Sequence, residues 1–254
     1  MDCDFGISPL VNQAIEDIQA NVAAALKQLK AGEGDDKTVH HVRTGLRRLE
    51  AFGESRLPKR LRKLRKESGK VRDLDVLMQL SEKLTLSPAQ KATLRKRAEK
   101  ARKSEAKRLR KLAKRVKPKK LRKWAEKHAS GQSAQGADLM GKLEWVLADP
   151  KYQELDERNL HDFRLALKPL RYRSEAAKEG QAAELAQFIH AAQSKAGDWH
   201  DWQMLQGFAR EILGPEAAAV SALIELELAR TYREAQRSAI ELRTHFQETR
   251  AAAA

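Results

Sequence analysis

The sequence has very little of what several common kinds of protein site require. Its 254 residues include a single cysteine, Cys3, which excludes an internal disulfide framework. Aromatic residues amount to 5% of the chain, and no stretch approaches the roughly 18 apolar residues that a membrane-spanning helix needs. The first residues, Met1-Asp2-Cys3-Asp4, form neither a basic segment nor a long apolar run, so we expect no standard secretion signal. We therefore predict a cytoplasmic protein that makes no contact with membranes.

Motifs for phosphate-transfer or metal chemistry are equally scarce. The sequence has no glycine-rich phosphate-binding loop. Two His-Asp dipeptides, His161-Asp162 and His200-Asp201, resemble adjacent ligands of metal-dependent phosphohydrolases, but such a site needs a further histidine and a distant aspartate around one ion. The dense Arg and Lys around them would repel a divalent cation. We predict no catalytic residues, no metal and no cofactor, and a phosphohydrolase is the least favoured of three interpretations.

Positive charge is what the sequence has in excess, and the excess is concentrated in one block. The net charge is +15 and the pI is near 9.9. Residues 59–123 contain 27 Lys and Arg against 6 Asp and Glu, whereas the remainder contains 23 against 29. A block of this kind suits a polyanionic partner, and charge alone does not choose among nucleic acid, anionic lipid and other polyanions.

Helix signals recur along the chain, and the alternation typical of strands is nearly absent. Ala, Leu, Lys, Arg and Glu dominate, which favours an all-α fold. Ser87-Pro88-Ala89-Gln90 predicts a capped helix start, and so do Ser8-Pro9 and an Asp at 35 or 36. We interpret Gly69 and Gly197 as helix ends and 130–136 as a linker. Helices are expected near 9–30, 36–53, 58–69, 71–84, 88–116, 119–129, 137–148, 155–179 (with a kink at Pro169), 182–196, 198–213 and 215–250.

Two segments carry the same pattern of one histidine followed by cations. The first ridge is His40, Arg43 and Arg47; the second ridge, 121 residues later, is His161, Arg164 and Lys168. Positions i, i+3 and i+7 share one face of a helix. Neighbouring leucines at 46, 49, 167 and 170 are placed to pack into a core. Three cations on one face repel one another, so each ridge favours an anionic ligand across it.

A second pair of segments also repeats, in the same order. Gly69-x-x-Arg72-Asp73 parallels Gly197-x-x-His200-Asp201 at an offset of 128 residues. Each follows its ridge by one intervening predicted helix. Two matched motifs in matched order predict a duplicated helical unit. We therefore place one repeat half at residues 5–130 and the other at 137–250.

With these four segments the chain resembles the CHAD domain family over residues 5–250. The resemblance implies two helical bundles related by a pseudo-twofold axis, built as duplicated four-helix units around a shared basic groove or pore. It also implies non-catalytic binding of inorganic polyphosphate. Glu50 and Pro169 stand where the family commonly has a base. The residues expected to contact polyphosphate are His40, Arg43, Arg47, Arg48, Arg65, Arg72, His161, Arg164, Lys168, Arg171 and His200.

The predicted partner is therefore inorganic polyphosphate or another polyanion, and phosphate or sulfate ions are expected to occupy the same site. Arg donates two parallel hydrogen bonds to phosphate, and a polyanion favours protonated His.

The run 91–123, with 18 Lys and Arg, is expected to form a wall of the anion groove. A basic helical nucleic-acid-binding protein is the alternative, and nucleic acid stays open as a secondary ligand. Association with polyphosphate granules is a further expectation, and the oligomeric state is left open. The other histidines are read as structural or surface residues, and the four tryptophans as core or interface residues.

Overall fold

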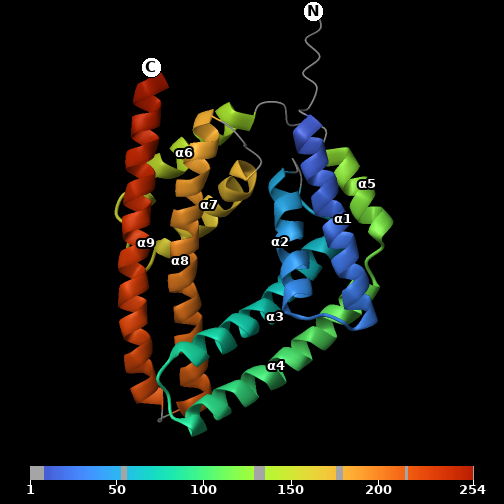
Figure 1. The fold of residues 1–254 in the computed structure, drawn as a ribbon, viewed down its shortest axis with the longest axis vertical. Coiled ribbons are helices and arrows are strands. Elements are labelled where there is room, and N and C mark those ends of the chain that lie inside the picture. The colour runs from blue at the N-terminus through green and yellow to red at the C-terminus, as the bar shows by residue number, and fades with distance from the viewer. Residues whose placement is uncertain (1–8, 53–55, 129–134, 176–179, 215–216, 254) are drawn as a thin grey trace, which may run out of the picture. The chain divides into compact units, whose positions relative to one another are not determined.

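The computed structural model describes residues 9–52, 56–128, 135–175, 180–214 and 217–253 (Figure 1). All regular secondary structure within these ranges is helical, which confirms the all-α prediction. None of the helices described is long and apolar enough to cross a lipid bilayer. The elements are α1 (Pro9–Ala31), α2 (Asp36–Phe52), α3 (Lys59–Lys83), α4 (Pro88–Lys114), α5 (Pro118–His128), α6 (Gln135–Ala148), the 3₁₀ helix η1 (Pro150–Tyr152), α7 (Leu160–Ser174), α8 (Gly180–Leu213) and α9 (Ala217–Ala253).

The predicted helix starts are confirmed where a side chain can cap the helix. The backbone N–H of Thr38 donates to Oδ1 of Asp35 at 2.7 Å, ahead of α2. At the start of α4 the N–H of Gln90 donates to Oγ of Ser87 at 3.2 Å, and the N–H of Ser87 donates to Oε1 of Gln90 at 3.1 Å. These reciprocal bonds satisfy N–H groups that the first helical turn leaves without partners. Gly32 follows α1 with a φ of +100°, a backbone conformation that favours glycine.

Two predicted helix ends are wrong. Gly69 lies inside α3 and Gly197 lies inside α8, so each helix continues where the sequence suggested a break. An isolated glycine keeps its backbone N–H and carbonyl, so it weakens a helix by only about 1 kcal/mol and does not interrupt the hydrogen-bond ladder. The reason for glycine at these positions lies in what packs against them.

The described residues fall into two units that do not follow a single cut in the sequence. Unit 1 comprises Met1–Val76 and Ala98–Ala134, and unit 2 comprises Leu77–Arg97 and Gln135–Ala254. The helices α3 and α4 therefore each contribute to both units. The division into repeat halves at 5–130 and 137–250 stays a prediction.

In unit 1, α1 and α2 pack closely along one another. Gly45 allows this approach, because a Cβ at that position would lie only 2.2 Å from Cγ2 of Val22. Leu46 and Leu49 of α2 are 0% and 1% exposed, as the sequence predicted. The apolar side of α2 is thus fixed against α1, and its ridge lies on a different face of the helix.

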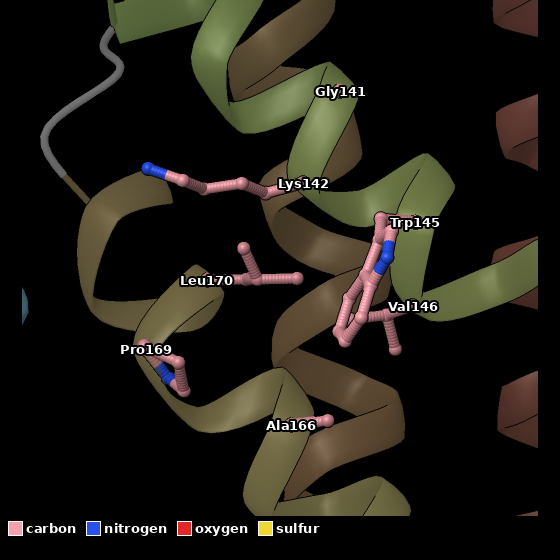
Figure 2. A pocket seen from close by; sticks show the side chains of 7 residues that line it. All are labelled: Gly141, Lys142, Trp145, Val146, Ala166, Pro169 and Leu170. Atoms are coloured by element: carbon pink, nitrogen blue, oxygen red, sulfur yellow. The ribbon is translucent and has the colours of Figure 1, made fainter. Parts of the chain in front are cut away.

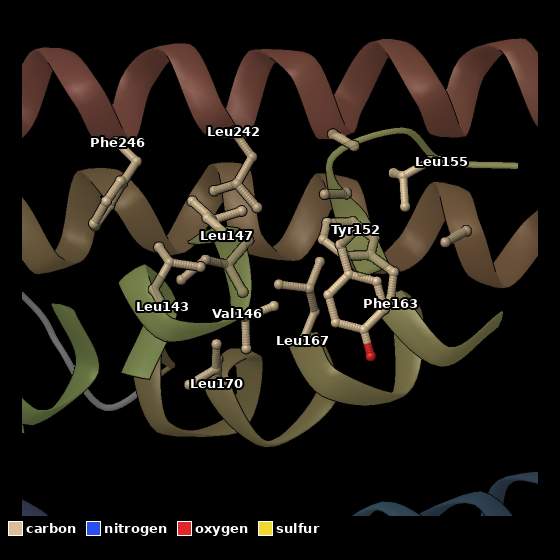
Figure 3. Packing of buried hydrophobic residues seen from close by; sticks show 14 of the residues in the cluster. Leu143, Val146, Leu147, Tyr152, Leu155, Phe163, Leu167, Leu170, Leu242 and Phe246 are labelled. Carbon is tan, nitrogen blue, oxygen red and sulfur yellow. The ribbon is translucent and has the colours of Figure 1, made fainter. Parts of the chain in front are cut away.

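In unit 2, the two longest helices, α8 and α9, lie side by side, and α6 and α7 cover them (Figure 3). Leu167 and Leu170 of α7 are 0% and 3% exposed and lie in this core, as predicted. Leu242 and Phe246 of α9 contribute from the other side of the cluster. Burial of the leucines sets the rotation of α7 about its axis and hence the direction of its ridge.

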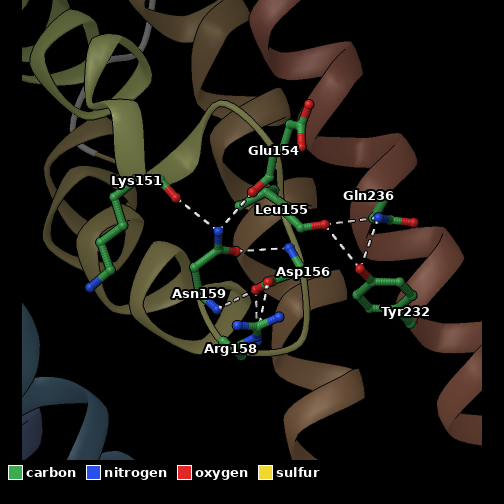
Figure 4. A network of polar contacts seen from close by, with 8 residues as sticks. All are labelled: Lys151, Glu154, Leu155, Asp156, Arg158, Asn159, Tyr232 and Gln236. Carbon is green, nitrogen blue, oxygen red and sulfur yellow. Dashed lines mark hydrogen bonds and ion pairs between the residues drawn. The ribbon is translucent and has the colours of Figure 1, made fainter.

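The segment before α7 is held in a fixed loop by a polar network (Figure 4). Asn159 donates to the carbonyls of Lys151 and Glu154 at 2.8 and 2.7 Å. The carbonyl of Leu155 accepts from Tyr232 and from Gln236 of α9, at 2.9 Å in each case. The prediction of helix at 155–159 is therefore wrong, because side chains take up the backbone groups that a helix would use. The network places the start of α7, one residue before His161.

Candidate functional site

In unit 1 the first ridge lies on α2 and meets α3. Partial burial lowers the pKa of His40, and the nearby cation Arg72 of α3 lowers it further, followed by His41, Arg43 and Arg48. Arg43 is half-buried, and its Nη2 lies 3.4 Å from Oδ1 of Asp73. The structure therefore brings residues of the first ridge together with Arg72 from the Gly-x-x-Arg-Asp segment. We call His40, Arg43, Arg47 and Arg72 the first cluster.

The Arg43 side chain packs against α3 at Gly69. A Cβ on Gly69 would lie 3.5 Å from Nε of Arg43, so the guanidinium group lies directly over the α3 backbone at that position. The same arrangement occurs in unit 2, where a Cβ on Gly197 would lie 3.3 Å from Nε of Arg164. Glycine thus provides room for the ridge arginine at position 197, whereas at position 69 a Cβ would make an ordinary contact with it.

Unit 2 repeats the histidine contact as well. The rings of His161 and His200 have centroids 4.3 Å apart with planes inclined at 46°. His200 occupies the position that Arg72 has in unit 1, three residues after the glycine. We call His161, Arg164, Lys168 and His200 the second cluster. It carries two permanent charges and two titratable ones, whereas the first cluster carries three permanent charges.

Burial and neighbouring cations both keep the second cluster's histidines neutral. Burial lowers the pKa of His200 to about 4, with Arg164 and His161 as the next causes. Burial also lowers the pKa of His161, and Arg164 lowers it further. Both rings are therefore uncharged at neutral pH in the free protein. An anion placed among them would favour their protonation.

A third contact recurs at matched positions with different chemistry. In unit 1, Nη1 of Arg65 lies 3.1 Å from Oε2 of Glu50. In unit 2 the residues 121 and 128 positions later are Arg171 and Gln193, and Nη1 of Arg171 donates to Oε1 of Gln193 at 2.5 Å. Glu50, at a position where the CHAD family commonly has a basic residue, thus pairs with Arg65, a basic residue of the facing helix. Arg65 and Arg171 join helices within their units in addition to any contact with a ligand.

Several polar atoms of the clusters are buried without a hydrogen-bond partner. These are Nε of Arg47 and the Nδ1 atoms of His161 and His200. Buried polar groups in proteins nearly always have partners. Oxygen atoms of an anion lying across the clusters would supply them.

Gln193 is a site residue that the sequence analysis did not identify. It is 4% exposed and shares one face of α8 with Gly197 and His200, at positions i, i+4 and i+7. Reading Gly197 as a helix end divided this face into two helices and hid the pattern. Arg65, Gly69 and Arg72 have the same spacing on α3, so a continuous helix would have revealed both faces.

The His-Asp dipeptides have other partners. Asp162 accepts from Nζ of Lys151 at 2.5 Å, and this contact lowers the pKa of Asp162. Among the residues that the structure describes, no group of three or more His, Cys, Asp and Glu side chains is placed to hold a metal ion.

Pro169 lies inside α7 and lines an apolar pocket instead of extending the ridge (Figure 2). The pocket has a volume of about 600 Å³ and lies between α6 and α7. Trp145 stands at its edge and is 72% exposed, whereas the other three tryptophans are buried. Leu170 and Ala166 complete the wall next to Pro169.

The sequence comparison identifies the family. Residues 10–210 match the CHAD domain, and the chain belongs to this family, which is associated with polyphosphate binding. A search of curated proteins finds no match. Two solved structures share the fold. The CHAD domain from the plant Ricinus communis is 18% identical with a TM-score of 0.65, and the alignment covers 97% of this chain and 93% of that one. PptA from Streptomyces chartreusis is 16% identical with a TM-score of 0.58, and the alignment covers 96% of this chain and 99% of that one.

Proposed function

We propose that this protein binds inorganic polyphosphate, without altering it, through the first and second clusters. The observation that carries the proposal is the recurrence of the cluster in both units. In each unit an arginine three residues after the ridge histidine lies over a glycine of the facing helix. In each unit, too, the residue three positions after that glycine approaches the histidine. The membership of the CHAD domain family supports polyphosphate as the ligand.

The chemistry of the clusters suits a linear phosphate polymer. Polyphosphate has no bases to read, so recognition rests on charge density and on hydrogen bonds to oxygen atoms. Arginine supplies permanent charge and paired donors in a fixed geometry. Histidine adds charge only when an anion raises its pKa. Targeting to polyphosphate granules follows if a long chain on a granule surface offers the same oxygen atoms.

The test is a variant of the first cluster with a control of equal charge. Arg43→Gln with Arg47→Gln should lower the affinity for polyphosphate by about 100-fold, because each charge-assisted hydrogen bond contributes about 1.5–3 kcal/mol. It should also make the dependence of affinity on salt shallower. The control is Arg60→Gln with Lys63→Gln, two exposed cations of α3 in the same unit. Titration calorimetry at several salt concentrations measures both quantities.

Equal losses in the variant and the control would mean that net charge, and not the cluster, determines binding. The proposal that binding is non-catalytic is checked in the same samples. Release of orthophosphate from polyphosphate, with or without added divalent metal, would contradict it.

A further inference from the structure

One face of α4 carries a straight stripe of lysines that belongs to neither cluster. Successive members are separated by three, four, four and three residues, which places them within about 80° of one another around the helix axis and over about 21 Å of its length. All are exposed, and none makes a hydrogen bond or ion pair with another residue that the structure describes. All lie in unit 1. The lysine stripe consists of Lys100, Lys103, Lys107, Lys111 and Lys114.

The arginines of the same stretch have a different role. Arg102 forms an ion pair with the buried carboxylate of Asp75 in α3. Nη2 of Arg110 donates to the carbonyl of Ala31, at the end of α1, at 2.8 Å. Leu109, on the side of α4 opposite the stripe, is 0% exposed. Arg102 and Leu109 therefore attach α4 to its unit on the side away from the lysine stripe. Arg110 attaches it from the edge of the stripe, about 60° around the axis from the stripe's centre.

No carboxylate of α4 lies on the stripe. The two acids of the helix, Glu99 and Glu105, are about 80° and about 160° around the axis from its centre. Like charges three and four residues apart destabilise a helix by a few tenths of a kcal/mol for each pair. A solvated helix face normally mixes both signs. An uninterrupted stripe therefore costs stability unless an anion lies along it.

We propose that the lysine stripe binds the sugar-phosphate backbone of a nucleic-acid duplex without sequence preference. A duplex is stiff over about 150 base pairs, so its phosphates are already held in an array and need no ordering on a straight helix. Over the 21 Å of the stripe a duplex presents about 12 phosphate charges. Lysine ammonium groups are point charges that accept any phosphate orientation.

Other polyanionic partners fit the stripe less well. The whole of α4 is described, and it has no aromatic residue on which single-stranded bases could stack. It also has no exposed large apolar side chain that could insert into a membrane. A flexible polyphosphate chain would lose conformational freedom in following a straight line. The inference does not depend on the proposed function of the clusters, and it allows one molecule to hold a duplex and polyphosphate together.

The experiment compares two variants with the same loss of charge. The stripe variant replaces all five lysines with glutamine, which has a similar helix propensity. The control replaces five exposed lysines scattered over α1, α2, α3 and α5 of the same unit: Lys27→Gln, Lys37→Gln, Lys66→Gln, Lys119→Gln and Lys123→Gln. Binding to a labelled duplex DNA of mixed sequence and to a duplex RNA is followed by fluorescence anisotropy from 50 to 200 mM salt. Circular dichroism verifies the fold of each variant.

Five phosphate contacts predict that this increase in salt lowers the wild-type affinity for the duplex by about 500-fold. The stripe variant should bind the duplex at least ~100-fold more weakly at low salt and lose most of the salt dependence, while the control stays within ~5-fold of wild type. Polyphosphate binding should change little in the stripe variant, and duplex binding should survive in the Arg43→Gln, Arg47→Gln variant.

Equal losses in stripe and control variants would overturn the inference. So would a preference of the stripe for phosphatidylserine vesicles or single strands over the duplexes. Failure of wild type to bind polyphosphate would instead contradict the function proposed for the clusters.

Discussion

At the scale of single residues, the two clusters differ most at one position. Unit 1 has an arginine at this position, Arg72, and arginine is a permanent cation. In unit 2, burial lowers the pKa of His200 to about 4, so this side chain is neutral in the free protein. Both approach the histidine of their ridge. Unit 1 therefore always has a charged side chain at this position. In unit 2 the side chain becomes charged only when an anionic ligand raises its pKa.

Replacing either of these residues with the other should change how polyphosphate affinity depends on pH. On the proposed function, bound polyphosphate raises the pKa of His200, so binding takes up a proton at pH values below the raised pKa. Affinity should then rise as the pH falls from 8 to 5.5, by about tenfold for each unit by which the raised pKa exceeds 5.5. His200→Arg should flatten this dependence, and Arg72→His should steepen it. Calorimetry in buffers of different ionisation enthalpy measures the proton uptake. An unchanged pH profile in both variants would show that His200 does not face the ligand.

Stability of the free protein should change in the opposite direction. Unfolded His200 has an ordinary pKa near 6.5 and the folded residue one near 4, so the unfolded state binds more protons between these values. His200 therefore contributes stability above pH 6.5 that is lost as the pH falls towards 4. Tighter binding on acidification cannot then be attributed to a more stable fold.

At the scale of helices, the glycines of α3 and α8 lie where a ridge arginine crosses a helix backbone. A Cβ on Gly69 would make an ordinary contact with Arg43 at 3.5 Å. A Cβ on Gly197 would meet Arg164 at 3.3 Å, which requires the side chain to give way by a few tenths of an ångström. The two glycines are thus a matched pair that differ in how much space is left.

Alanine at the two positions should separate stability from binding. Gly69→Ala should raise the free energy of unfolding by about 0.5–1 kcal/mol and leave polyphosphate affinity within ~2-fold, because alanine suits a helix interior better than glycine. Gly197→Ala should lower affinity by about 3–10-fold without lowering the melting temperature, because Arg164 is displaced. Thermal unfolding and calorimetric titration of both variants provide the comparison. Identical behaviour of the two variants would remove the proposed role of Gly197.

The helices show what sequence patterns can and cannot predict. The spacing of Leu46 and Leu167 predicted which face of each ridge helix is buried, because helical periodicity depends only on local geometry. The contact that suits glycine at position 197 comes from Arg164, which is distant in sequence, so local pattern could not distinguish this glycine from a helix end. Pairing of Glu50 with Arg65 also depends on how two helices lie against each other. Trp145 is exposed because it lies about 160° around the axis of α6 from the buried Leu143, on the side that faces away from the core.

At the scale of the whole molecule, two clusters in one chain predict a dependence on ligand length. We propose that one long polyphosphate contacts both clusters, in which case its second contact forms at a high effective concentration. We expect a long chain to bind at least ~100-fold more tightly per molecule than an oligophosphate that reaches one cluster. Replacing either His161, Arg164 and Lys168 or His40, Arg43 and Arg47 should remove this advantage and leave short-chain binding on the other cluster. Equal affinity for both lengths would indicate two independent sites and no shared groove.

The division of α3 and α4 between the two units limits how this protein can be taken apart or recombined. Residues 77–97 precede the midpoint of the sequence, yet they belong to the unit formed by residues 135–254. In that unit Leu80 and Lys83 line a pocket with Trp202 of α8. A cut between the repeat halves would separate these side chains from the residues around them. A fragment containing the first half alone would include residues 77–97, which pack in the unit formed by residues 135–254. Fusion, circular permutation and exchange of halves with relatives should therefore keep residues 77–97 together with the C-terminal portion of the chain.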